Sequence, residues 1–152
     1  MSVKIEIIRH SLAHILAAAV QELYPRVKFS IGPAIENGFY YDFDFPGSLA
    51  PQDLPGIEKK MREMIKKNLK FVKKNISKAE AKKLFKDQPY KLELIEELTE
   101  TRVSVNLQRP GSLLIYQVGD FLDLCKGPHV KSTKEMNSEA FKLTKIAGAY
   151  WK

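Results

Sequence analysis

Residues 9–14 read Arg9-His10-Ser11-Leu12-Ala13-His14 and open the most strongly patterned stretch of the chain. Beyond them, apolar residues recur at helical spacing as far as Tyr24, and Pro25 prevents an uninterrupted continuation. The spacing predicts a helix over residues 11–24, with its start beside the two histidines. Because positions four apart share one face of a helix, His10 and His14 should point to the same side.

The remaining histidine repeats this spacing, because His129 follows the only cysteine in Cys125-Lys126-Gly127-Pro128-His129. Three imidazoles and one thiol suit tetrahedral zinc, with two ligands from a helix and two from a loop. Two other interpretations remain open. The histidines can be caps or buried polar groups and the cysteine a small buried hydrophobe, or Cys125 can be a nucleophile with a histidine base. The matched pairs favour one shared site.

The composition indicates one compact domain over residues 1–152, since 152 residues with 44% hydrophobic side chains cannot form two ordinary cores. Lys and Arg number 25 against 18 acidic residues, and the net charge of +7 favours a nucleic acid partner, although charge can also serve solubility alone. One cysteine cannot form an internal disulfide, and we find neither a signal peptide nor a membrane-spanning stretch. We expect a cytoplasmic protein without a membrane partner.

The rest of the chain alternates between strand and helix patterns. Aromatic residues on odd positions predict a hairpin over residues 28–44. Further patterns predict helices at 57–69, at 77–86 from a Ser77/Glu80 capping box and at 89–98, with strands at 71–76, 103–107, 113–118 and 141–149. The expected fold class is α+β, an antiparallel sheet with helices packed on it.

Four segments carry a resemblance to a known family. They are His10-Ser-Leu-Ala-His14, the stretch Ile31-Gly-Pro-Ala-Ile-Glu-Asn-Gly-Phe-Tyr-Tyr-Asp42, Asp123-Leu-Cys-Lys-Gly-Pro-His129 and Lys145-Ile-Ala-Gly-Ala-Tyr-Trp151. Together they closely resemble the editing domain, or second additional domain, of bacterial-type threonyl-tRNA synthetases. The paired motifs also fit the alanyl-tRNA editing branch, but Gly-Phe-Tyr-Tyr-Asp and Gly-Pro-His are similar to the threonyl branch. No aminoacylation or anticodon-binding domain has a counterpart here, so we expect an excised domain or a free-standing editor.

The resemblance implies hydrolytic proofreading of seryl-tRNA(Thr), with cleavage of the ester at the tRNA 3′ end. Serine lacks one methyl group of threonine, and such a difference is worth only about 1–3 kcal/mol in a binding pocket, so a second hydrolytic site is needed. The expected partners are the acceptor end of tRNA(Thr) carrying serine and, for an excised domain, the remainder of the synthetase. The missing dimer-forming domain implies a monomer.

The resemblance also implies roles for seven residues. Beside the ester we expect His10 and Lys91 as catalytic residues, although Lys91 taken alone would pass for one more solvated lysine. The expected substrate-binding residues are His14, Tyr41, Asp123, Cys125 and His129.

On zinc, the resemblance and the ligand spacing disagree. Alanyl-type relatives hold zinc with the four equivalent residues, whereas threonyl-type editors work without a metal. Four protein ligands would also leave no open position for an activated water. We therefore expect no cofactor; if zinc is present, its ligands would be His10, His14, Cys125 and His129. The alternatives are a non-catalytic, zinc-stabilised tRNA-binding module and a free-standing alanyl-type deacylase.

Overall fold

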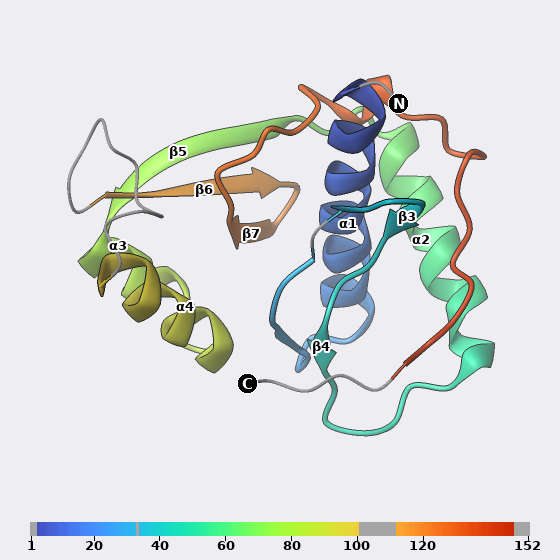
Figure 1. Cartoon of the computed structure of the whole chain (residues 1–152). Coiled ribbons are helices and arrows are strands. Elements are labelled where there is room, and N and C mark those ends of the chain that lie inside the picture. The colour runs from blue at the N-terminus through green and yellow to red at the C-terminus, as the bar shows by residue number, and fades with distance from the viewer. Residues whose placement is uncertain (1–2, 33, 101–111, 148–152) are drawn as a thin grey trace.

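The computed structural model describes residues 3–32, 34–100 and 112–147, which form helices and antiparallel sheets of the expected α+β class (Figure 1). The elements in chain order are α1 (Val3–Leu23), β1 (Lys28–Phe29), β2 (Ala34–Ile35), β3 (Gly38–Phe39), β4 (Phe43–Asp44), a 3-10 turn (Pro51–Asp53), α2 (Leu54–Lys66), β5 (Phe71–Ser77), α3 (Lys78–Leu84), α4 (Pro89–Glu100), β6 (Ser112–Val118), β7 (Phe121–Leu124) and a second 3-10 turn (Thr133–Glu135).

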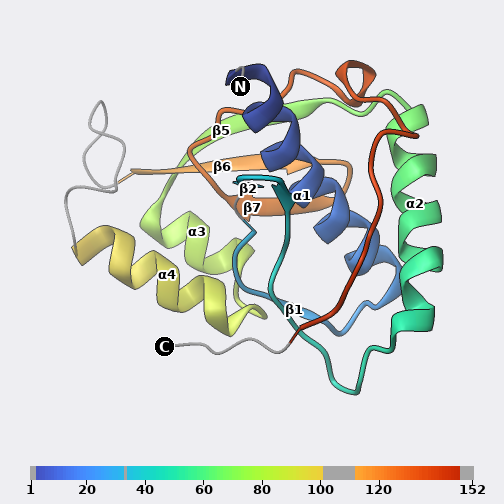
Figure 2. The same cartoon turned by 45° about the vertical axis from the view of Figure 1, so that its right-hand side comes forward.

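Helix α1 is the central element, with α2 on one side and the three-stranded sheet on the other (Figures 1 and 2). Every residue from Ser11 to Val20 is buried, as expected for a helix surrounded by other elements. The predicted start at residue 11 is wrong, because the helix already begins at Val3. Its first turns are rich in isoleucine, whose helix propensity is low, and packing against the core overrides that preference. No helix within the described ranges could cross a membrane.

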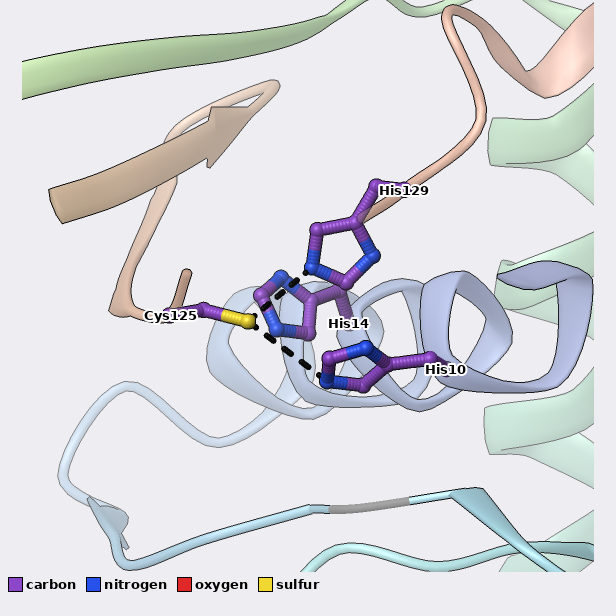
Figure 3. A group of neighbouring side chains, drawn as sticks. All are labelled: His10, His14, Cys125 and His129. Atoms are coloured by element: carbon purple, nitrogen blue, oxygen red, sulfur yellow. Dashed lines mark hydrogen bonds between the residues drawn. The ribbon is translucent and has the colours of Figure 1, made fainter. Parts of the chain in front are cut away.

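The predicted hairpin over residues 28–44 is present, but its ladder is split into two short pairs. Strand β1 pairs with β4, and β2 pairs with β3 nearer the tip. Arg9 Nη1 donates to the carbonyl of Glu36 at 2.5 Å, so the hairpin tip is fastened to α1. In Figure 3 this hairpin runs beside α1, below the helix in that view.

Strands β5, β6 and β7 form an antiparallel sheet with β6 in the centre. The β6–β7 register places Tyr116 opposite Asp123, and the chain then leaves β7 directly for Cys125. The predicted strands at 71–76 and 113–118 are confirmed, whereas the one at 103–107 lies outside the described residues. Ser77 caps α3 by accepting from Glu80 N at 3.1 Å, as the capping box predicts.

Helices α3 and α4 pack on the end of the sheet away from α2 and enclose a second, smaller core (Figure 1). This core is lined by Ile76, Phe85, Ile95 and Ile115. The predicted start of α4 at Pro89 is confirmed. Lys91, in its first turn, is directed away from this core toward the hairpin and β7, as its hydrogen bonds show.

The predicted closing strand is wrong, because residues 141–147 form no strand and 148–149 lie outside the described residues. The segment runs beside α2 instead (Figures 1 and 2). Leu143 N donates to Glu58 Oε1 at 2.8 Å, and the Arg62 guanidinium lies over the Phe141 ring at 5.4 Å. Phe141 is thus buried by contacts with a helix and not by pairing with the edge of a sheet. The alternating pattern of this segment therefore does not indicate a strand.

Candidate functional site

The structure brings the two matched pairs of the sequence together (Figure 3). His10 and His14 project from α1 toward the loop after β7, which carries Cys125 and His129. Cys125 Sγ lies 3.3 Å from His129 Nε2 and 3.5 Å from His10 Nε2. One side-chain nitrogen or sulfur from each of the four residues lies within 4.8 Å of the others. The four side chains therefore form one cluster, which we call the histidine cluster.

The loop that completes this cluster depends on Gly127. Its φ is +76°, a backbone conformation that residues with a Cβ rarely adopt. A Cβ at this position would also lie 2.5 Å from the Tyr116 hydroxyl. Gly127 N donates to Cys125 Sγ at 3.3 Å, and a cis peptide bond joins Gly127 to Pro128. The glycine thus lets the chain turn closely around the cysteine.

Aromatic rings surround His129, which is partly buried. Phe71 stacks on its ring at 5.4 Å, and Tyr116 meets it edge-on at 4.5 Å. The ring centroids of His14 and His10 lie 4.1 and 4.3 Å away. Burial lowers the pKa of His129 to about 2, and burial also lowers the pKa of His10. Both imidazoles are therefore neutral near pH 7.

Cys125 is a thiol rather than a thiolate in this setting. Burial raises its pKa to about 11, outweighing the hydrogen bond from Gly127 N. A nucleophilic cysteine needs a lowered pKa. The raised pKa thus argues against Cys125 as a nucleophile, and the two imidazoles beside its sulfur can accept the S–H proton.

A buried ion pair lies next to the histidine cluster and joins α4 to β7. Lys91 is 2% exposed and Asp123 3%, and Lys91 Nζ donates to Asp123 Oδ1. Lys91 Nζ also donates to the Tyr41 hydroxyl at 2.9 Å and to the Ser30 carbonyl at 2.5 Å. The Tyr41 hydroxyl in turn donates to Asp123 Oδ2 at 2.7 Å. An ammonium group has three protons, so Lys91 is fully used within the protein.

His14 connects the ion pair to the histidine cluster. Its Nε2 lies 3.4 Å from Asp123 Oδ2, and its pKa is lowered well below the usual value by burial and by the neighbouring His10. Because the carboxylate only accepts, this contact favours the neutral His14 tautomer that carries its proton on Nε2. The remaining nitrogen, Nδ1, is a buried acceptor without a hydrogen-bond partner among the described residues. A ligand that supplies an N–H or O–H would satisfy it.

The expected neighbours of the substrate are thus divided between two contact groups. His10, His14, Cys125 and His129 form the histidine cluster, whereas Lys91, Asp123 and Tyr41 form the ion-pair network. Both Asp123 oxygens already accept hydrogen bonds within the protein, Oδ1 from Lys91 and Oδ2 from Tyr41. The alternative view of Lys91 as a solvated surface lysine is wrong.

Five residues that support the site received no role from the sequence: Ser11, Ser30, Gly32, Phe71 and Tyr116. Ser11 is the one with a usable signal, because it is the single hydroxyl in a buried apolar run and adjoins His10. The others act through contacts with residues distant in the sequence, such as the Ser30 carbonyl with Lys91. Such contacts carry no local pattern.

Comparison with known proteins places this geometry in a family. Residues 113–149, which include β7 and the loop to His129, match the model of the threonyl and alanyl tRNA synthetase second additional domain. The chain is 52% identical over 148 residues to a threonine–tRNA ligase of Dehalococcoides mccartyi, and 53% identical over 150 residues to that of Thermotoga maritima.

Each of these alignments covers 97% of the chain but only 23% and 22% of the respective ligase. A threonine–tRNA ligase of Rubrobacter xylanophilus is 49% identical over 146 residues, 21% of its length. The chain spans less than a quarter of these curated relatives. It belongs to the second additional domain family in its threonine–tRNA ligase branch, where it corresponds to one segment of a larger enzyme.

Proposed function

We propose that this chain hydrolyses the ester of seryl-tRNA(Thr) and so removes serine attached in error. The observation that carries the proposal is the convergence of three neutral imidazoles beside a buried, unfilled acceptor, in a chain about half identical to a segment of threonine–tRNA ligases. For a ligase that attaches threonine to its tRNA, serine is the smaller amino acid most similar to the correct substrate, because the two differ by one methyl group. As a segment of a ligase, the chain would act on the acceptor end of the tRNA charged by the same enzyme.

The reaction needs a water held against the ester carbonyl. The water oxygen bonds to the carbonyl carbon, the bond to the ribose oxygen breaks, and the water's protons end on the ribose hydroxyl and the released serine. His10 is the candidate to hold this water, because its neutral ring offers an acceptor nitrogen at the edge of the cluster and it is less buried than His14. Its Nε2 nitrogen lies beside the Cys125 thiol.

Recognition of the seryl group is assigned to His14 and its neighbours. Serine has an ammonium and a hydroxyl group, and both can donate hydrogen bonds. His14 Nδ1 is an acceptor that has no donor among the described residues. The adjacent Asp123 carboxylate favours positive charge at this place, although Lys91 already balances it. In the proposal, the pocket beside this acceptor is also lined by Tyr41, Cys125 and His129.

Lys91 acts in this proposal by position and charge rather than as a free donor. All three of its protons are bound by Ser30, Tyr41 and Asp123, so a direct bond to the developing oxyanion requires release of one of them. Its charge still favours negative charge formed nearby, since screening is weak in a buried site. This revises the simpler expectation of a lysine directed at the ester.

Deacylation measured on three substrates tests the proposal. The 152-residue chain, checked for folding by circular dichroism, is mixed with seryl-tRNA(Thr), threonyl-tRNA(Thr) and alanyl-tRNA(Ala). We expect rapid release of serine and slow release of threonine and alanine. Faster release of alanine would favour the alanyl-type editor, and no release from any substrate would contradict hydrolysis.

A zinc-stabilised tRNA-binding module is the second candidate, because the histidine cluster suits zinc. Zn–S and Zn–N bonds of about 2.3 and 2.0–2.1 Å in a tetrahedron place sulfur and nitrogen roughly 3.5 Å apart, close to the separations of 3.3 and 3.5 Å observed here. Such a site would use His10, His14, Cys125 and His129 and leave no open position for water. We propose metal-free hydrolysis. Stoichiometric zinc in the purified chain, with loss of folding on chelation, would favour the module.

A further inference from the structure

We propose that Ser11 is a positioning residue: by donating its proton to Ile7 O, it holds His129 as the Nδ1–H tautomer and so leaves the Nε2 lone pair of His10 free. This inference rests on the proposed hydrolysis, in which His10 holds the water. The tautomer itself is a property of the protein alone and is measured without any substrate.

Three groups meet the hydroxyl of Ser11, which is 0% exposed. Its Oγ lies 2.8 Å from Ile7 O, 3.0 Å from Val130 N and 3.0 Å from His129 Nδ1. A hydroxyl has one proton and two lone pairs. Val130 N–H can only donate and takes one lone pair, whereas Ile7 O can only accept. The remaining question is whether the proton goes to Ile7 or to His129.

Each choice fixes the whole histidine cluster. If Ser11 donates to Ile7 O, its second lone pair must receive a proton from His129 Nδ1, and His129 Nε2 becomes an acceptor. If Ser11 donates to His129 Nδ1, then His129 Nε2 carries the proton of the neutral ring and donates to Cys125 Sγ. The serine hydroxyl thus selects between two opposite directions of hydrogen bonding.

The effect reaches His10 through the cysteine. His10 is hydrogen-bonded to the backbone of Pro128, which has only a carbonyl to offer, so one ring N–H is used there. The other nitrogen of the neutral ring is an acceptor next to Cys125 Sγ. When His129 Nε2 is also an acceptor, it takes the thiol proton and His10 keeps its lone pair. In the opposite arrangement the thiol proton occupies His10.

One separation favours the first arrangement. Ser11 Oγ lies 2.8 Å from Ile7 O, which is an ordinary O–H···O distance and is close for two oxygens without a proton between them, and 3.0 Å from His129 Nδ1, an ordinary N–H···O distance. The contact of Cys125 Sγ with His129 Nε2, at 3.3 Å, is present in both arrangements and does not distinguish them. A free acceptor on His10 is also what holding a water requires.

Nitrogen NMR of the chelator-treated chain tests the assignment. The chain has only three histidines, and a His129→Gln variant identifies the signals of His129. Long-range proton–nitrogen spectra of the wild-type protein should show His129 protonated at Nδ1. Ser11→Ala should shift His129 toward the Nε2–H form. An Nε2–H tautomer in the wild-type protein would overturn the inference, even where the alanine variant fails to fold.

Thr133→Val is the matched control. Thr133 is also 0% exposed, and its hydroxyl likewise donates to a helix carbonyl, Ile65 O at 2.8 Å, and accepts a backbone N–H, from Leu69 at 2.9 Å. It lies outside the histidine cluster. We expect its loss to lower stability without changing the His129 tautomer, whereas an equal tautomer change in both variants would show a general structural effect and contradict the proposal.

Kinetics then links the tautomer to hydrolysis. Ser11→Ala should lower kcat for seryl-tRNA(Thr) about tenfold or more with little change in KM, since an acceptor is lost and not a binding contact. Thr133→Val should leave kcat unchanged. A Ser11→Ala variant with an altered tautomer and full kcat would refute the link. If the wild-type chain releases no serine, the proposed function fails, while the spectra still decide the tautomer.

Discussion

Lys91 on α4 and Asp123 on β7 form a buried ion pair that fastens the smaller core to the strand leading into the histidine cluster. The Tyr41 hydroxyl lies between them, accepting from Lys91 and donating to Asp123, so the hairpin is held by the same pair. Three separate parts of the chain therefore depend on one network for their relative positions.

Loss of Lys91 should strongly destabilise the protein. Lys91→Met leaves Asp123 buried without its counterion, and such a change costs about 3–5 kcal/mol. Urea unfolding followed by circular dichroism measures it. Adding Asp123→Asn should restore part of the loss, because an uncharged amide needs no counterion.

Lys78→Met is the control for that experiment, because Lys78 pairs with Glu96 at 3.1 Å on the surface, where both side chains are 40–45% exposed. An exposed pair contributes only about 0–1 kcal/mol. Equal losses from Lys91→Met and Lys78→Met would show that the buried pair does not hold these elements together.

Replacement of Gly32 should displace Tyr41. A Cβ at Gly32 would lie 2.7 Å from Tyr41 Cγ and 2.8 Å from Cε2, well inside van der Waals contact. Gly32→Ala should therefore cost about 1–3 kcal/mol of unfolding free energy. It should also lower the pKa of Tyr41, which burial raises, toward the ordinary tyrosine value. Ultraviolet titration and urea unfolding measure these effects.

Gly38→Ala supplies the comparison, since nothing lies within 4 Å of a Cβ at Gly38. This variant should unfold close to the wild-type urea concentration. If Gly32→Ala behaves in the same way, the close approach of Tyr41 to the hairpin backbone is not as described.

Acidification should destabilise the protein before its carboxylates titrate. Burial lowers the pKa of His10, His14 and His129, so the unfolded chain takes up protons below about pH 6.5 while the folded chain does not. The contribution of these histidines to the free energy of unfolding is fully present above about pH 6.5. It falls as the pH drops below that value, by up to about 1.4 kcal/mol per pH unit for each histidine.

Thermal unfolding between pH 7 and 5, with chelator present, measures this dependence. His129→Gln should show a shallower slope, because one of the titrating groups is gone. A melting temperature that does not fall between pH 7 and 5 would mean that the imidazoles are not held neutral by burial.

His10→Ala should remove hydrolysis without unfolding the chain. The side chain is less buried than His14, so its loss leaves a smaller cavity, whereas the water loses its acceptor. We expect serine release to fall by about 10²-fold or more, with unchanged circular dichroism. Lys66→Ala, an exposed residue at the end of α2, should retain full activity. Full activity of His10→Ala would take His10 out of the mechanism.

Local pattern was enough to predict most helices and strands, including the capping of α3 by Ser77, because hydrophobic period and capping chemistry are encoded within a few residues. It failed where tertiary contacts decide. The isoleucine-rich start of α1 has only a weak helix pattern of its own. Its packing against the core stabilises the helix there. The alternation at residues 141–147 looks like a strand but is satisfied by Glu58 and Arg62 of α2.

For the site, spacing pointed to one cluster but not to its chemistry. The two motifs could be paired because each supplies two ligands at the same interval. By contrast, Lys91 is one of many lysines, and only its contacts with Ser30, Tyr41 and Asp123, which lie 32 to 61 residues away in sequence, show that it is fully bonded. The role of Ser11 depends on Val130, 119 residues later. No local pattern reports such partners.

The most direct measurement is a crystal structure of the chain with a non-hydrolysable amide analogue of 3′-seryl-adenosine. We predict that the seryl ammonium or hydroxyl lies within hydrogen-bond distance of His14 Nδ1, and that a water bound to His10 faces the carbonyl carbon. An analogue seated away from the histidine cluster, or one that leaves His14 Nδ1 unpartnered with no water on His10, would contradict the assignment of this site to ester hydrolysis.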